Sequence, residues 1–118
     1  MISFSEEELL IYGFGSYFNG RAEYKDIDLL ILHESIDKKS CTLAINLKEV
    51  LSTQLNLSHI SILSKSEAAQ LSFIEKSRCI LIGSVPSNAM HSGAKSIIDK
   101  IKSLHPAPKI IMAIRTFK

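Results

Sequence analysis

The stretch GFGSYFNGRAEYKDIDLLIL, residues 13–32, decides the fold expected for this chain. It begins within one short apolar run, 9–15, and ends within a second, 26–33. Short apolar runs next to turn residues are typical of buried strands. The glycine-rich segment between them predicts a turn, with one or two helical turns after Ser16. The stretch therefore predicts two buried strands joined by a polar connection.

The remainder of the chain predicts alternating helices and strands. Apolar residues at helical spacing indicate the helices, and short β-branched runs indicate the strands. Ser64 followed by Glu67 is a capping-box pattern that predicts the start of one helix. The helices are expected over 40–55, 65–76, 93–104 and 109–118, and the further strands over 59–63 and 79–83. This order predicts one α/β (α+β) domain over 1–118, with a mixed sheet flanked by helices.

The composition is that of an ordinary globular chain, with 46% hydrophobic and 22% charged residues in 118. No apolar run reaches the roughly 20 residues needed to cross a bilayer, so we expect no membrane association. The acidic N-terminal segment argues against a secretory signal. Cys41 and Cys79 lack the spacing of a metal or redox motif, so we expect free thiols in a reducing cytoplasm.

The net charge of +2 is unevenly distributed along the chain. Residues 1–37 carry eight acids and two bases, whereas 91–118 carry six bases and one acid. Solvated faces of surface elements would explain this distribution. The alternative is an acidic half that holds metal and a basic half that attracts a polyanion such as RNA. RNA binding by the basic third is the weakest functional hypothesis, because no aromatic residues are interleaved for stacking.

Asp26 and Asp28 open the second apolar run and are the first candidates for chemistry. Residues two apart on a strand point the same way, and their Cα atoms would lie about 7 Å apart. Two carboxylates at this distance can hold divalent cations, and hard oxygen ligands favour Mg²⁺ or Mn²⁺ over Zn²⁺. The alternative is that both acids lie in solvent at the first turn of the strand.

Gly15 and Ser16 are the second candidate pair. A glycine at the end of a strand lets the backbone approach a ligand closely. Backbone N–H groups after Ser16 could then point at a phosphate, with the hydroxyl adding a hydrogen bond. The alternative is an ordinary strand-to-helix turn with Ser16 as the cap. Neither a dinucleotide-binding glycine fingerprint nor a GK[ST] phosphate loop is present.

Taken together, these residues resemble a known pattern. An apolar strand, Gly15-Ser16, Gly20 and then Asp26-Ile-Asp28 on a second apolar strand is similar to the polymerase-beta-like nucleotidyltransferase superfamily. The likeness is greatest to its small, stand-alone, antitoxin-like members, and the specific match covers about 20 residues.

The resemblance implies a site at one end of a mixed sheet. Gly15 and Ser16 would contact the phosphates of a nucleoside triphosphate, and Asp26 and Asp28 would be the catalytic metal ligands. The nucleotidyl group would pass to a hydroxyl or amine acceptor on a protein or RNA. Such transfer depends mainly on positioning and charge neutralisation.

Two departures from the family pattern leave a second hypothesis open. Active members usually carry a third carboxylate on a later strand, but the strand expected here offers His59 instead, and Glu67 is better explained as a helix cap. Lys25 precedes the acid pair and could compete with a cation. The alternative is therefore a domain that binds nucleotide or a partner without transfer, as a homo-oligomer or with another protein. The tail 107–118 could supply that interface.

Overall fold

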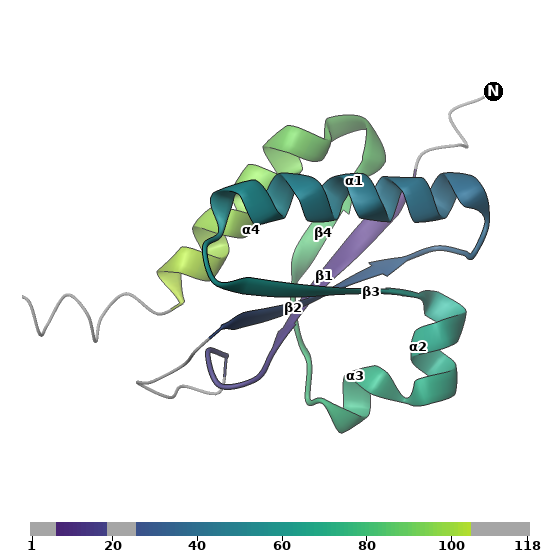
Figure 1. The fold of residues 1–118 in the computed structure, drawn as a ribbon, viewed down its shortest axis with the longest axis horizontal. Coiled ribbons are helices and arrows are strands. Elements are labelled where there is room, and N and C mark those ends of the chain that lie inside the picture. Colours follow the sequence, from purple (N-terminus) through teal and green to yellow (C-terminus); the bar gives the residue numbers. More distant parts are fainter. Residues whose placement is uncertain (1–6, 19–25, 105–118) are drawn as a thin grey trace, which may run out of the picture.

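The computed structural model describes residues 7–18 and 26–104, and Figure 1 shows how its elements are arranged. Gly20, Lys25 and the tail 107–118 lie outside the described residues. The strands are β1 (Glu8–Phe14), β2 (Ile27–His33), β3 (Ser58–Ser64) and β4 (Ile80–Pro86). The helices are α1 (Lys38–Gln54), α2 (Lys65–Leu71), α3 (Phe73–Lys76), the 3₁₀ turn η2 (Ser87–Ala89) and α4 (Met90–Ser103). The predicted α/β class and all four predicted strands are confirmed.

The strands form one mixed sheet in the order β3-β2-β1-β4. β1 is antiparallel to both β2 and β4, whereas β2 and β3 are parallel. Parallel neighbours need a long crossover connection, and α1 supplies it between β2 and β3. The two apolar runs of the 13–32 stretch are therefore the two central strands of the sheet.

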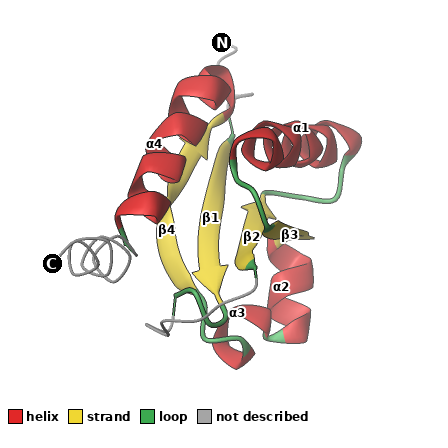
Figure 2. Ribbon diagram, turned by 60° about the vertical axis from the view of Figure 1, so that its left-hand side comes forward, coloured by secondary structure: helices red, strands yellow, loops and turns green. Residues whose placement is uncertain are grey.

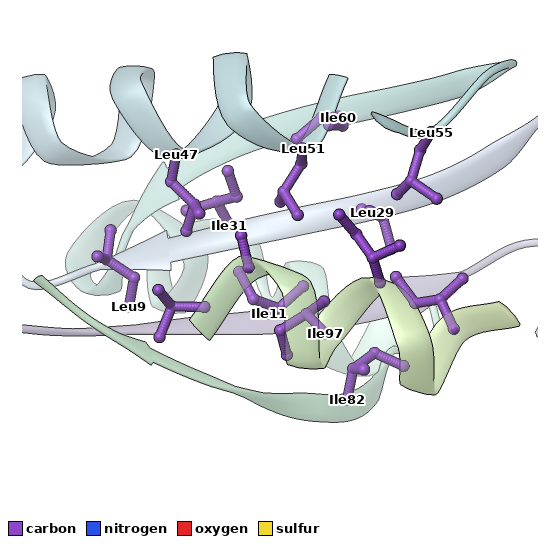
Figure 3. Packing of buried hydrophobic residues seen from close by; sticks show 14 of the residues in the cluster. Leu9, Ile11, Leu29, Ile31, Leu47, Leu51, Leu55, Ile60, Ile82 and Ile97 are labelled. Carbon is purple, nitrogen blue, oxygen red and sulfur yellow. The ribbon is translucent and has the colours of Figure 1, made fainter. Parts of the chain in front are cut away.

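The main core lies between the sheet and the helices α1 and α4, which cover the same face (Figure 2). Alternate residues of each strand point into it, because side chains on a strand alternate between faces. Figure 3 shows the strand residues Leu29 and Ile31 packing against Leu47 and Leu51 of α1. All four of these side chains are fully buried.

The helices α2 and α3 lie on the opposite side of the sheet from α1 and α4 (Figure 1). Phe14 at the end of β1 packs edge-to-face against Phe73 of α3, with ring centroids 5.4 Å apart. Leu30 and Leu32, which point toward this second face, are buried as well. β2 is therefore covered on both faces, which explains why its sequence is almost continuously apolar.

The predicted capping box is confirmed, but the helix that it starts is shorter than expected. Ser64 Oγ accepts a hydrogen bond from Glu67 N–H, and the Glu67 carboxylate accepts one from Ser64 N–H. The prediction of one helix over 65–76 is wrong, because Ser72 adopts a left-handed conformation with φ 50° and separates α2 from α3. None of the described helices has the length and apolar character that crossing a bilayer requires.

Candidate functional site

The turn after β1 begins at Gly15, whose φ of +84° lies in the left-handed region that favours glycine. Phe18 N–H donates to Gly15 O over 3.1 Å, which closes the turn. A side chain at Gly15 would also collide with Oδ2 of Asp28. The positive φ therefore favours glycine here, and the carboxylate expected to bind metal lies in the space that a side chain would take.

The register of the sheet explains why Asp28 reaches this turn. Asp28 pairs with Phe14 across the antiparallel β1–β2 ladder, one residue before Gly15. It pairs with His59 across the parallel β2–β3 ladder. Asp28 therefore lies on β2 at one end of the sheet, with the Gly15 turn on one side and His59 of β3 on the other. Asp26 lies just before β2 and is exposed.

Burial raises the pKa of the Asp28 carboxyl above its ordinary value. The nearby positive charge available to His59 lowers it, and the negative charge of Asp26 raises it again. The Asp28 side chain is 27% exposed, so the carboxylate has lost part of its hydration. A cation bound here would offset both the desolvation and the repulsion from Asp26.

His59 lies on β3, the strand on which the resemblance to nucleotidyltransferases predicts a third carboxylate. Its Nδ1 lies 3.7 Å from Oδ1 of Asp28, a distance typical of an ion pair rather than a direct hydrogen bond. The imidazole is 78% exposed, so it can move and meet a ligand from solvent. An imidazole nitrogen can bind a metal ion or accept a proton.

Glu67 is excluded as a substitute for the missing carboxylate. It is held in the capping box with Ser64, at the opposite end of β3 from His59. Ser64 lies five positions after His59, which corresponds to about 16 Å along the strand. The hydrogen bond from Ser64 N–H lowers the pKa of Glu67, as expected for a carboxylate committed to capping.

Two aromatic residues that the sequence analysis did not single out hold the turn in place. Tyr17 is buried, and its hydroxyl donates to the carbonyl of Ile101 in α4 over 2.7 Å. The Phe18 ring packs edge-to-face on the Tyr17 ring at 5.0 Å and fills the space beside Gly13. Ser16 lies between Gly15 and Tyr17, half-buried in the same turn. Large aromatics directly after Gly-Ser are the sequence signal for this anchoring.

In the part of the chain that the structure describes, no three His, Cys, Asp or Glu side chains converge closely enough to hold a metal ion. Asp28 and His59 are brought together, whereas Asp26 acts on Asp28 through its charge alone. This arrangement resembles sites in which one or two carboxylates bind Mg²⁺ and the substrate phosphates and water complete its coordination.

A second polar cluster lies at the opposite end of β2 and was not predicted. The Oγ of Ser40 lies 3.0 Å from Nδ1 of His33, accepts from Ser35 N–H over 3.1 Å and donates to Glu7 over 2.8 Å. His33 and Ser40 are both buried. Because the Ser40 proton is directed at Glu7, the serine is not activated by the histidine. This cluster joins the start of β1 to the start of α1.

Comparisons with models of protein families, with curated proteins and with solved structures gave no match.

Proposed function

We propose that this chain is a nucleotidyltransferase-like protein that binds a nucleoside triphosphate with Mg²⁺ or Mn²⁺ at the Gly15 end of the sheet. It would transfer the nucleotidyl group to a hydroxyl or amine on a protein or RNA acceptor. One observation carries the proposal: Gly15, in a positive-φ turn, leaves its side-chain space to the Asp28 carboxylate. A candidate phosphate turn and a candidate metal ligand are thus in direct contact.

The roles follow from the chemistry of the groups. The backbone at Gly15 and the hydroxyl of Ser16 would contact phosphate oxygens, which a bulkier residue at Gly15 would prevent. Asp28, supported by Asp26, would bind the cation that neutralises the triphosphate. A cation held there would neutralise phosphate charge and so favour transfer, without covalent participation by the protein.

A second candidate function is nucleotide or partner binding without transfer. The observation that favours it is His59, an exposed imidazole in the position where an acid would complete the metal site. A nitrogen ligand suits Mn²⁺ better than Mg²⁺, and a neutral imidazole offsets less metal charge than a carboxylate. In this case the protein would retain the bound triphosphate unchanged.

The test separates binding from transfer. Binding of each nucleoside triphosphate would be measured by calorimetry with Mg²⁺, with Mn²⁺ and with chelator, and transfer would be followed with α-labelled nucleotide. Asp28→Asn is expected to remove metal-dependent binding, whereas Asp99→Asn, at an exposed acid on α4, is the matched control. Absence of metal-dependent binding at about 1 mM nucleotide would refute nucleotidyl transfer and nucleotide binding, and would leave partner binding alone. Binding without labelled product on protein or RNA would support the second.

The two cysteines support a place in the cytoplasm. Cys41 and Cys79 are both free thiols, and burial raises the pKa of Cys79, which keeps it protonated and unreactive. A reducing compartment suits such thiols.

A further inference from the structure

The two edges of the sheet differ in how well they are protected against pairing. β4 ends in Pro86 and meets β1 through a register shift at Ile11/Tyr12. Proline and irregular register both discourage the addition of another strand. β3, with the sequence SHISILS, has no proline, no lysine and no acid, and pairs with β2 in unbroken register. Within residues 7–18 and 26–104, no strand pairs with its outer edge.

We propose that this edge is a homodimer interface, in which β3 pairs antiparallel with β3 of a second copy to form one continuous sheet. The backbone is oriented for such pairing. Ile27 N–H donates to the carbonyl of Leu57, which sets the alternation of the parallel ladder. By that alternation, the N–H and C=O groups of Ile60 and Ile62 point away from β2, toward the open edge. They are the groups that the second copy would bind.

A shallow groove of about 390 Å³ runs beside this edge, on the face covered by α1. One stripe of α1 and one residue of β3 line it: Ile45, Lys48, Glu49, Ser52 and Ile62. Ile45 is 58% exposed. Most of the surface that lines the groove is apolar, because the polar side chains contribute their carbon atoms to it. The open backbone edge therefore lies beside an apolar surface that a second helix could cover.

The spacing of the elements fits a second copy. α1 packs over both β2 and β3, and strands lie about 4.8 Å apart. Pairing of two β3 strands would therefore place the two α1 helices about 10 Å apart, within the usual range for packed helices. Both helices would lie on the same face of the joined sheet.

The charged residues of the groove would also be complementary across a two-fold axis. In an antiparallel arrangement of the two α1 helices centred between Lys48 and Glu49, each Lys48 faces Glu49 of the second copy. The same symmetry places Ile45 opposite Ser52 of the second copy. The β3 strand carries no lysine, arginine or acid that would add repulsion at the centre. Pairing of Lys48 with Glu49 across a two-fold axis favours a second copy as the partner. An unrelated peptide has no two-fold relation to this chain and would not be expected to match it.

The first experiment measures mass against concentration by sedimentation equilibrium of the full chain, without nucleotide. The wild type is expected to approach twice its 13.1 kDa as concentration rises. Ile45→Lys should weaken dimerisation at least about tenfold, because it adds a second positive charge beside Lys48 and removes apolar contact. Leu81→Lys is the matched control, since Leu81 on β4 is 56% exposed and should leave the dimer unchanged.

The second experiment separates lost charge complementarity from damage to the fold. Lys48→Glu places two acids at the centre of the groove, and Glu49→Lys places two bases there. Each variant alone should be monomeric, and an equimolar mixture should form a heterodimer. A wild type that stays monomeric to about 1 mM would overturn the proposal and leave the edge to an extended segment of another protein. The proposal would also be overturned if Leu81→Lys dissociated the dimer and Ile45→Lys did not. It would be overturned as well if the mixture of Lys48→Glu and Glu49→Lys stayed monomeric.

Discussion

Gly15 leaves the space of a side chain to the carboxylate of Asp28. The contact joins the end of β1 to the start of β2 and depends on the antiparallel register between them. The same glycine has positive φ, so a side chain at position 15 would both strain the backbone and displace the Asp28 carboxylate. This pair therefore links the turn after β1 to the candidate metal ligand on β2.

Gly15→Ala should reduce both stability and nucleotide binding. The left-handed backbone alone costs an alanine about 1 kcal/mol, and the collision with Asp28 adds to it. Urea unfolding would measure the loss. In the double variant Gly15→Ala/Asp28→Ala the collision is relieved, so its destabilisation should be smaller than the sum of the two single effects. Additive effects would show that the Gly15–Asp28 contact carries no energy.

Asp28→Asn should stabilise the protein at neutral pH, by less than about 1 kcal/mol. Because burial raises the pKa of Asp28, the folded protein holds this proton more tightly than the unfolded chain. The contribution of Asp28 is therefore most favourable below its ordinary pKa of 3.8 and is lost as the pH rises through the raised value. Urea unfolding at pH 7 and near pH 3 checks this, because the gain should vanish in acid. A variant that is less stable than wild type at pH 7 would contradict burial as the main cause.

His59→Asp should strengthen cation binding at the candidate site. The substitution places a third carboxylate beside Asp28 in the parallel register, and oxygen ligands favour Mg²⁺. Calorimetric titration with Mg²⁺ and Mn²⁺ would show tighter binding, with the larger gain for Mg²⁺. Ser61→Asp, two residues along β3 on the same face, is the control. Equal gains from both variants would indicate a general charge effect rather than a site at residue 59.

Ser40→Ala should destabilise the protein by about 1–3 kcal/mol without changing nucleotide binding. The substitution removes the Oγ that partners His33, Glu7 and the N–H of Ser35, and it leaves a buried imidazole unsatisfied. Urea unfolding measures the loss, and Ser103→Ala, at the exposed end of α4, is the control. A loss equal to that of the control would show that the cluster is not structural.

The sequence was informative where the structural signal is local. The apolar run of β2 and the Ser64–Glu67 capping box predicted elements that the structure confirms. The break at Ser72 was missed, because serine has no strong preference for the left-handed region that it adopts there. The four-strand order was not predictable either, since a strand pattern does not specify which neighbour it pairs with.

The candidate site was predictable in part. Gly15 and Asp28 were chosen from their spacing, and the structure brings them into contact. The nearness of His59 to Asp28 depends on the register of two strands joined by a 17-residue helix, and residue patterns do not fix that register. The His33–Ser40–Glu7 cluster was missed for the same reason: its members come from three segments that only the finished fold brings together.

The hydrogen bond from Tyr17 to Ile101 links the turn at Gly15 to the far end of α4. The Ile101 carbonyl accepts both from the Tyr17 hydroxyl and from the N–H of Leu104, which closes the last turn of that helix. A ligand that immobilises the turn would therefore also reduce local opening at the end of α4. Slower amide hydrogen exchange at Leu104 on ligand addition would make this helix end a remote reporter of events at Gly15.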